Sequence, residues 1–297
     1  MDIAITMPTH GLLERDEQNF YLQRLEPENV RPFEFAQLAD KLGWYGLRVL
    51  CGAVLLFLLT PILVIIPLSF SNSSFLAYPI PGWSLRWYQE LFASSDWARA
   101  TKNSFIVAPL ATLIATALGT LAAVGLARVQ FFGKGLITGL LIAPMVVPIV
   151  VVGVSTYLFF AKIGLSDSYT GLVLVHAALG APFVLTTVLA TLQSFNQNLV
   201  KASLSLGAGP LQTFFRVTLP VIAPGVISGA LFAFATSFDE VVVTLFLAGP
   251  EQTTLPRQMF TGIRENISPT IAAVATLLIL FTASLMGALE WLRGRVK

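Results

Sequence analysis

Six long stretches of this sequence contain no charged residue, and each is at least 22 residues long. A helix needs about 20 mostly apolar residues to cross the hydrocarbon core of a membrane. The stretches are 49–85, 103–127, 135–161, 168–200, 217–238 and 266–289. Only 11% of all residues are charged, against roughly 25% in an average soluble domain. The chain is therefore expected to be all-α, a polytopic membrane protein with six transmembrane helices.

The distribution of Lys and Arg predicts the orientation. With six spans both termini lie on one side, and that side carries twelve of the 18 basic residues. Loops rich in Lys and Arg stay in the cytoplasm. We therefore expect a multi-pass protein of the bacterial cytoplasmic (inner) membrane, with both termini and the loop at 193–220 on the cytoplasmic side.

Several function classes lack the residues that they need. Tyrosines aside, His176 and Cys51 are the sole ionisable residues within the six stretches, whereas proton- and ion-coupled carriers use intramembrane carboxylates and lysines. The sequence contains no GxxxxGKS/T phosphate-binding loop, no catalytic set and no metal-ligand cluster. A net charge of +2 gives no reason to expect a nucleic-acid partner. The chain is expected to bind no metal or cofactor, to be no enzyme, and to take its energy from a partner. His176, without acidic company, is expected to be a hydrogen-bonded packing residue.

Two domains are expected. Residues 1–44 are a retained cytoplasmic tail, in which Phe35, Leu38 and Leu42 recur at helical spacing and predict a short interfacial elbow helix. Residues 45–297 form the membrane domain.

Glycine and proline mark packing and bending inside the predicted spans. Gly135 with Gly139, and Gly225 with Gly229, form GxxxG pairs that let two helix backbones approach closely. Pro144 and Pro148 remove backbone donors and are expected to bend the third span as a gate hinge.

The loop at 193–220 is polar and patterned. We expect a short helix over about 197–206, a sharp turn at Gly207 and Gly209, and a second short helix that starts at Pro210. By pattern alone, a knob that seats in a groove on a soluble protein and a self-contained hairpin are equally good interpretations.

The stretch "KASLSLGAGPLQTFFRVTLPVIAPG" resembles the EAA loop of permease subunits of binding-protein-dependent ABC importers. Leu219-Pro220, expected to end the second helix, matches the closing Leu-Pro of that motif. Lys201 stands where the motif has glutamate, and Ser203 stands where it has its second alanine. The residues implied to couple to the ATPase are Lys201, Ala202, Ser203, Gly207, Ala208, Gly209, Leu219 and Pro220.

The resemblance covers roughly residues 45–295 and implies a type I ABC importer permease fold with a cytoplasmic EAA coupling-helix loop. It also implies a homodimer of ABC ATPase subunits that uses ATP and Mg, a second, homologous permease subunit that completes a heterodimer, and an external solute-binding protein. "WSLRWYQELF", "ATKNSF", "SFDEVVVTLFLAGP" and "TLPRQMF" resemble the permeases that import spermidine and putrescine. Permeases for other small amines, opines and aminophosphonates are the alternative within the family.

Two adjacent carboxylates, Asp239 and Glu240, follow the fifth span and precede the apolar "VVVTLFLAG", which is too short to cross a membrane. Negative potential at a cavity mouth favours a polycationic amine. With Ser237 and Phe238 they form the predicted solute pathway. In the alternative interpretation Asp239 caps the next helical segment and Glu240 faces water.

Two other classes are disfavoured. A secondary carrier conflicts with the charge-free spans and leaves the knob unexplained, and a membrane scaffold has no use for bent spans and glycine seams.

Overall fold

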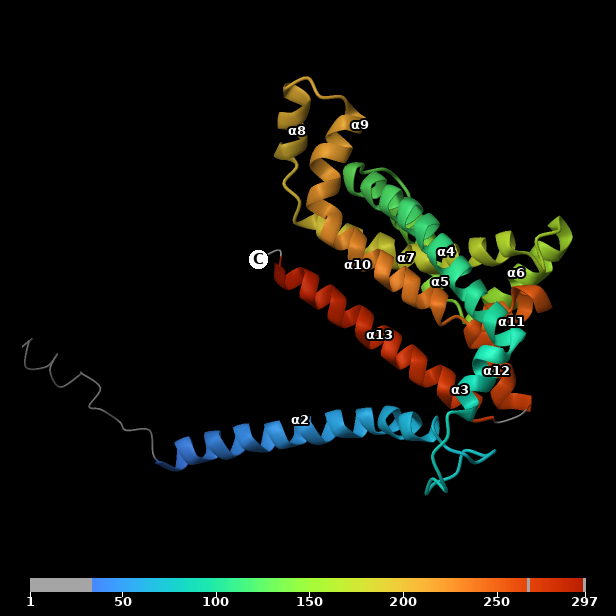
Figure 1. The fold of residues 1–297 in the computed structure, drawn as a ribbon. Helices are drawn as coiled ribbons and strands as arrows, with labels where there is room; N and C mark the ends of the chain where they lie inside the picture. Colours follow the sequence, from blue (N-terminus) through green and yellow to red (C-terminus); the bar gives the residue numbers. More distant parts are fainter. Residues whose placement is uncertain (1–33, 266–267, 296–297) are drawn as a thin grey trace, which may run out of the picture. The chain divides into compact units, whose positions relative to one another are not determined.

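The computed structural model describes residues 34–265 and 268–295, and these are almost entirely helical (Figure 1). The predicted tail, 1–44, lies mostly outside the described residues. The described part of this tail, residues 34–44, forms the first turns of α2 (Glu34–Leu68). No break separates these turns from the rest of α2, so they do not form a separate elbow helix. The described chain contains no strand, and its one isolated β-bridge joins Ser71 to Trp83.

The chain divides into two units, 1–64 and 65–297. The described part of the first unit belongs to α2. Residues Leu42–Leu68 of this helix are long and apolar enough to cross a membrane. Within the charge-free run 49–85, α2 stops at Leu68 and residues 69–85 are irregular.

Three helices form the core of the second unit: α4 (Ser95–Arg128), α7 (Tyr169–Gln193) and α10 (Leu219–Phe238). Small residues bring them together, and a Cβ atom added at Gly229 of α10 would lie 2.7 Å from the Cα of Val184 in α7. The close approach predicted for Gly225 and Gly229 is thereby confirmed, since both glycines face α7. The buried residues that fill the seam are Val107, Ala111, Ala115, Ala123, Val184, Leu185, Val188, Ile222 and Ala233.

The other predicted glycine pair packs differently. No atom of the described chain lies within 4 Å of a Cβ atom added at Gly135 or Gly139. Within the described chain, the close helix approach predicted for this pair is therefore not observed.

The third predicted span is broken rather than gently bent. It consists of α5 (Lys134–Val146) and α6 (Ile149–Ile163), which meet at an angle of 103°. The break lies at Val147, whose extended backbone (ψ 132°) reflects the clash that a following proline imposes on a helical residue. Pro148 therefore causes the predicted bend, whereas Pro144 lies inside α5 without interrupting it.

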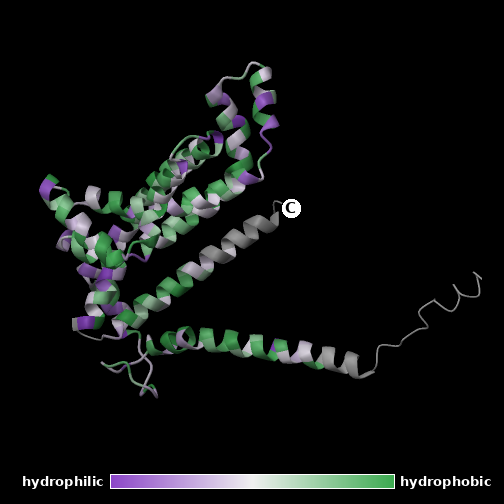
Figure 2. Cartoon of the chain, turned by 180° about the vertical axis from the view of Figure 1, so that it is seen from behind, coloured by the Kyte–Doolittle hydropathy of each residue, from purple (hydrophilic) through white to green (hydrophobic). Residues whose placement is uncertain are grey.

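Shorter helices lie at the two ends of the core (Figure 1). At one end lie α8 (Asn198–Ser205), α9 (Pro210–Thr213) and the π-helix η1 (Phe214–Thr218). At the other, which we call the α11 end, lie α3 (Arg86–Ala93), α11 (Val242–Leu247), the 3₁₀ turn η2 (Pro250–Gln252) and α12 (Leu255–Glu265). Figure 2 shows hydrophobic residues along the core helices and hydrophilic residues gathered toward these ends.

Four described helices are long and apolar enough to span a membrane, and the α5–α6 pair is a fifth span if counted as one. The final helix, α13 (Thr270–Arg295), has 26 residues, and its described apolar part is Thr270–Ser284. The helices thus follow the six predicted apolar runs, and the expectation of an all-α polytopic membrane protein is confirmed.

Candidate functional site

The first candidate region is the knob, defined as α8, the turn at 206–209, α9 and η1. Gly207 has φ +86°, a left-handed conformation that side chains disfavour. Its amide donates to the carbonyl of Leu204 at 3.0 Å, and the amide of Ala208 donates to that of Ser203 at 3.2 Å. These bonds end α8 as a glycine cap does. The helix predicted over 197–206 and the turn at Gly207 are confirmed.

Gly209 and Pro210 complete the turn. Pro210 is the first residue of α9, as predicted. Gly209, however, has φ −70° and ψ 164°, which any residue can adopt. The turn therefore depends on one glycine and not on two.

The second arm of the knob does not end at Leu219-Pro220, and this prediction is wrong. Residues Pro210–Phe238 run as one helix of 29 residues through the π-turn η1. The amide of Leu219 donates to the carbonyl of Phe214, five residues back. Pro220 lacks an amide proton and would collide with the carbonyl of Arg216 in a regular α-helix, and the wider π-turn accommodates it. The knob is therefore continuous with α10.

One side-chain hydrogen bond joins the two arms, between the hydroxyls of Ser203 and Thr213 at 3.0 Å. The outward surface of the knob is partly apolar, because Leu206 is 88% exposed and Leu211 is 76% exposed. Lys201 and Ala202 are also exposed, as are Gly207, Gly209 and Pro220, while Ser203, Ala208 and Leu219 are partly buried. Six of the eight predicted coupling residues thus lie on the knob, and Leu219 and Pro220 lie in the first turn of α10.

The second candidate region is the acidic mouth, defined as Asp239 and Glu240, between α10 and α11. Asp239 is exposed. Glu240 is partly buried, and its Oε1 accepts the amide of Val243 at 2.7 Å. Burial raises the pKa of the Glu240 carboxyl, and the amides of Val243 and Val242 oppose this rise. The helix-capping role considered for Asp239 belongs to Glu240, and Asp239 is the carboxylate that faces outward.

The neighbours of the acidic mouth point into the protein. Ser237 is 5% exposed, and its hydroxyl lies 2.9 Å from Nδ1 of His176. Phe238 packs against Phe105 and Phe281, with ring centroids 5.6 and 6.5 Å apart; Phe105 belongs to α4 and Phe281 to α13. Both residues were predicted to line the solute pathway, and here both make contacts within the protein. The predicted packing role of His176 is confirmed.

The apolar segment after the acidic mouth folds back as α11, which has only six residues and does not span a membrane. Val243, Thr244 and Leu247 are buried, and α11 packs against α6 and α7.

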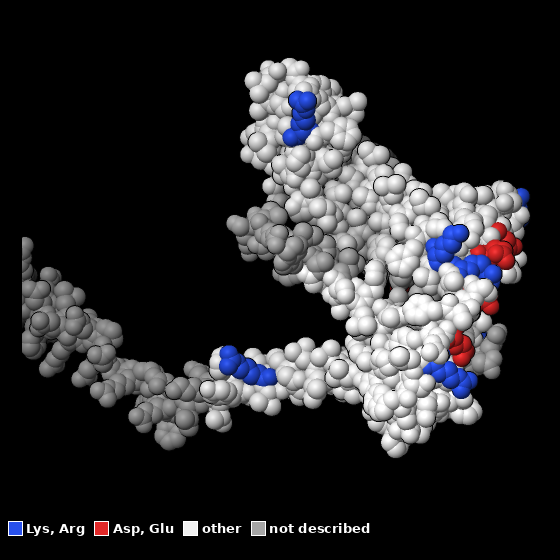
Figure 3. All heavy atoms as spheres, viewed as in Figure 1, with Lys and Arg blue, Asp and Glu red and all other residues white. Residues whose placement is uncertain are grey.

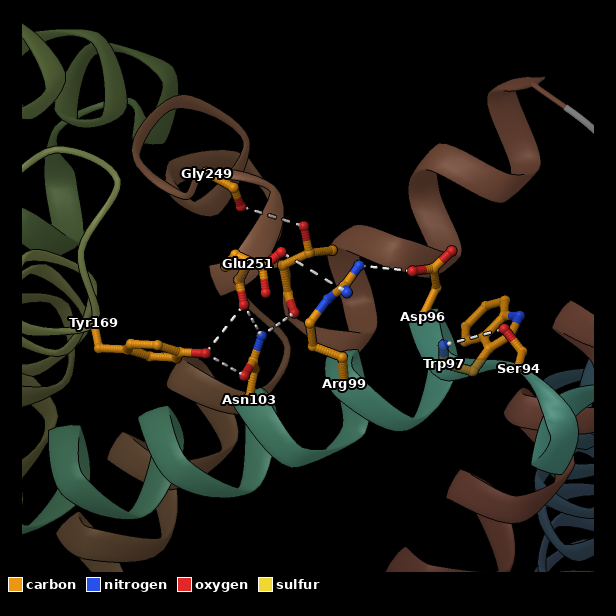
Figure 4. A network of polar contacts seen from close by, with 9 residues as sticks. Ser94, Asp96, Trp97, Arg99, Asn103, Tyr169, Gly249 and Glu251 are labelled. Atoms are coloured by element: carbon orange, nitrogen blue, oxygen red, sulfur yellow. Dashed lines mark hydrogen bonds and ion pairs between the residues drawn. The ribbon is translucent and has the colours of Figure 1, made fainter.

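The loop at 248–254, after α11, is held by a side chain that the sequence did not single out. Asn103 of α4 is 1% exposed, and its Nδ2 donates to the carbonyls of Glu251 and Thr253, both at 2.8 Å (Figure 4). The hydroxyl of Tyr169, the first residue of α7, donates to Oδ1 of Asn103 at 2.8 Å and lies 3.0 Å from the carbonyl of Glu251. We call this set the Asn103 clamp. The sequence signal for this clamp is an uncharged amide, Asn103, at the start of an apolar run. Asn103 was not predicted because only ionisable residues within the runs were considered as functional.

Arg257 of α12 holds the same loop from within. Its Nη1 donates to the carbonyls of Ala248 and Gly249. Burial lowers the pKa of the Arg257 guanidinium, and the negative charge of Asp167 opposes this effect. The amide of Asp167 in turn donates to the carbonyl of Leu247 at 3.0 Å. The end of α11 is thus fixed to the turn that precedes α7.

Charge differs between the two ends of the second unit. Figure 3 shows acidic residues at the α11 end and only a basic patch on the knob. The acidic residues of this unit whose side chains the structure describes are Glu90, Asp96, Asp167, Asp239, Glu240 and Glu251. The cations at the end with the knob are Arg128, Lys134, Lys201 and Arg216. Within the described residues, no group of three His, Cys, Asp or Glu side chains has a geometry that fits a metal ion.

Comparisons with known proteins give the relationships of the chain. It is 36% identical over 242 residues to the putrescine transport system permease protein PotI of Escherichia coli K12, covering 79% of this chain and 85% of that one. It is 31% identical over 230 residues to the spermidine/putrescine transport system permease protein PotC of Haemophilus influenzae, covering 77% and 89%.

A solved structure shares the fold. A chain of a bacterial ABC transporter involved in the import of the acidic polysaccharide alginate superposes with a TM-score of 0.67 at 15% identity, over 86% of this chain and 97% of that chain.

The family described as "Binding-protein-dependent transport system inner membrane component" matches residues 115–297. This match covers more than half of the chain and includes the knob, α10 and the acidic mouth. The chain is therefore a non-catalytic, multi-pass transport subunit, and it belongs to the family of inner membrane components of binding-protein-dependent transport systems.

Proposed function

We propose that this protein is one of two permease subunits of an ABC importer for a small cationic amine of the putrescine or spermidine class. The observation that carries the proposal is the sequence identity to permeases named for putrescine and spermidine, over more than three quarters of this chain. The alginate transporter has the same fold and a cargo of opposite charge, so the fold alone is no guide to the cargo.

The orientation follows from charge. The end with the knob has four described cations and no described acidic side chain, which favours a position in the cytoplasm. The acidic mouth then faces the external side, where a solute-binding protein delivers the amine. The partners are a homodimer of ABC ATPase subunits, which binds ATP and Mg, and a second, homologous permease.

The chain's own contribution is mechanical. Lys201–Gly209 contacts the ATPase, and the exposed leucines of the knob supply apolar surface for that contact. Because Pro210–Phe238 is one continuous helix of 29 residues, a displacement of the knob is passed along it, through the π-turn η1, toward the acidic mouth, at most about 40 Å away at 1.5 Å per residue. The broken α5–α6 pair, with its corner at Pro148, is the proposed gate hinge.

The acidic mouth acts on charge. Asp239 is exposed and supplies negative potential where a cation enters. Moving an unpaired charge into hydrocarbon costs roughly 2.5 to 3.5 kcal/mol even on the lenient insertion scale. A carboxylate at the entrance of a hydrated route lowers the barrier for an amine.

The experiment reconstitutes the chain with its ATPase, its partner permease and its binding protein in proteoliposomes. Putrescine or spermidine is expected to stimulate ATP hydrolysis, and an opine and an aminophosphonate serve as comparison solutes. Stimulation by one of the comparison solutes alone overturns the amine assignment. Failure of the chain to co-purify with an ATPase and a second permease overturns the subunit assignment.

The acidic mouth is tested separately with Asp239→Asn combined with Glu240→Gln. Glutamine keeps an oxygen that accepts the amide of Val243, so the turn is preserved while the charge is removed. We expect weaker uptake of the amine and unchanged assembly. Unaltered uptake kinetics contradict the role of the acidic mouth and leave the subunit assignment standing.

A further inference from the structure

We propose that His176 is a positioning residue for the acidic mouth, because its imidazole joins the two ends of the segment that carries Asp239 and Glu240. This inference rests on the proposed function, since it assigns a purpose to the direction in which the two carboxylates point. It goes beyond packing, because it predicts an effect on solute delivery that is separate from stability.

The contacts are buried within the second unit. His176 is 1% exposed on α7. Its Nδ1 lies 2.9 Å from the hydroxyl of Ser237, two residues before Asp239. Its Nε2 lies 3.1 Å from the hydroxyl of Thr244, four residues after Glu240. One rigid ring thus contacts the last turn of α10 and the first turns of α11, the two helices that flank the acidic mouth.

Further hydrogen bonds extend this arrangement to the acidic mouth itself. The hydroxyl of Thr244 donates to the backbone carbonyl of Glu240 at 3.2 Å. The carboxylate of Glu240 accepts the amide of Val243 at 2.7 Å. His176 is therefore linked through Thr244 to the backbone of Glu240. Through Ser237 it is linked to the end of α10, and Asp239 is the residue directly after that helix. Rotation of the 238–242 turn requires breaking at least one of these buried bonds.

The chemistry of the three side chains fits a positioning role better than two alternatives. A neutral imidazole has one donor and one acceptor. Because the Thr244 hydroxyl donates its proton to the carbonyl of Glu240, it accepts from Nε2–H of His176, and Nδ1 accepts from the Ser237 hydroxyl. A proton carrier would need a titratable neighbour, and the ring's two hydrogen-bond partners are hydroxyls. An apolar residue of similar volume would fill the space but leave the buried hydroxyls of Ser237 and Thr244 without the bonds seen here.

The position of the turn matters because Asp239 has no described partner that holds its carboxylate. The direction of this side chain is set by the backbone that carries it, and in the proposed function Asp239 acts through its negative potential on the cation that enters. A loosened turn should therefore raise the solute concentration needed for half-maximal uptake more than it lowers the maximal rate.

The test compares His176→Leu and His176→Gln in the complete reconstituted transporter with its binding protein. In His176→Leu both bonds are lost, and we expect the half-saturating concentration of putrescine-loaded binding protein to rise about tenfold, with basal ATP hydrolysis retained. His176→Gln should lie between this variant and the unmodified protein, because its amide can still bond Thr244. Val188→Ala, also fully buried on α7, is the matched control: it loosens the core without touching the turn, and should lower thermal stability without changing the half-saturating concentration.

A second readout avoids transport altogether. In a chain with Cys51→Ser and Asp239→Cys, the rate of labelling by a cationic thiol reagent reports the exposure of position 239. Adding His176→Leu should change that rate at least severalfold, and adding Val188→Ala should not. If His176→Leu fails to assemble, Ser237→Ala removes the bond to Nδ1, and Thr244→Val removes the bond to Nε2 together with the bond to the carbonyl of Glu240. Both variants change the volume little and are measured in the same two ways.

The outcomes separate this inference from the function on which it rests. If Asp239→Asn weakens amine uptake while His176→Leu, Ser237→Ala and Thr244→Val leave both half-saturation and labelling unchanged, the positioning role is refuted and the acidic mouth stands. If Asp239→Asn itself has no effect on uptake, the acidic mouth is refuted, and a change in labelling alone would then show a role confined to structure.

Discussion

At the α11 end, a buried amide, a phenol and a guanidinium hold the loop 248–254 from three directions, whereas one hydrogen bond between Ser203 and Thr213 joins the arms of the knob. Burial differs in the same way, because Asn103 is 1% exposed and Leu206 is 88% exposed. The α11 end is thus held by several buried hydrogen bonds, whereas the knob is exposed and its arms are joined by one side-chain hydrogen bond.

The difference indicates how each end meets a partner. A loop fixed by buried hydrogen bonds is preorganised, so a protein that docks there gives up little free energy to order it. The exposed leucines of the knob favour an interaction site there, since apolar surface left open to water is a feature of such sites. We therefore expect mutations in the knob to act on coupling to the ATPase, and mutations at the α11 end to act first on the fold of this chain.

Gly207→Val is expected to have the largest effect on transport. A β-branched residue at φ +86° is strained by roughly 1–2 kcal/mol or more, so the turn between α8 and α9 shifts and the contact with the ATPase is misplaced. Uptake should be abolished, while the chain still inserts in the membrane and pairs with the second permease. Uptake by proteoliposomes and co-purification with each partner are the measurements.

Gly209→Ala is the matched control for that change, because Gly209 has an ordinary φ of −70° and no atom lies within 4 Å of an added Cβ. Uptake close to that of the unmodified protein is expected. Equal losses in the two variants would mean that the whole turn requires glycine, and the distinction between the two positions would then be wrong.

Asn103→Leu is expected to have the next largest effect, and this effect is on stability. The change removes the donor to the carbonyls of Glu251 and Thr253 and the acceptor of the Tyr169 hydroxyl. Leaving buried polar groups without partners costs about 1–3 kcal/mol for each group. Thermal unfolding of the purified complex should begin at a clearly lower temperature, with ATPase binding retained.

Glu251→Gln separates the side chain of Glu251 from its backbone. The carboxylate of Glu251 lies 3.9 Å from Arg99, and it is 72% exposed. Such a surface ion pair contributes at most about 1 kcal/mol. The part of Glu251 that the Asn103 clamp contacts is its backbone carbonyl, which the substitution leaves unchanged. Thermal stability should therefore hardly change, and a loss as large as that of Asn103→Leu would show that charge, not the clamp, holds the loop.

The sequence predicted the features that depend on local rules. Apolar runs predicted the spans, because the membrane imposes one length on every crossing. Gly207, Pro210 and Pro148 were interpreted correctly because backbone geometry constrains each of them directly. Gly225 and Gly229 belong to the same group, since close helix packing requires small residues.

The features that were missed depend on tertiary partners. The π-turn keeps the helix continuous across Pro220 through a hydrogen bond from the amide of Leu219 to the carbonyl of Phe214. The sequence does not show this bond, and a Leu-Pro pair alone predicts the end of a helix. Asn103 has its meaning only through carbonyls about 150 residues further along the chain. Gly135 and Gly139 have the pattern of a helix contact but no partner within the described chain.

Glu240→Gln is expected to have the smallest effect. It tests whether Glu240, and not Asp239, is the partly buried carboxylate that caps the next helical segment. Burial raises the pKa of Glu240 above its ordinary value of 4.5 in the folded chain. Just above pH 4.5 the folded state therefore keeps a proton that the unfolded state has lost, and stability falls as the pH rises through the two pKa values. Glutamine accepts the amide of Val243 and does not titrate, so the variant should match the unmodified complex at low pH and be slightly more stable above this window. Melting temperatures measured from pH 4 to pH 7 decide the point: a complex that gains stability relative to Glu240→Gln as the pH rises would show that the ionised carboxylate is favoured in the fold, and Glu240 would then be the better-held charge of the pair.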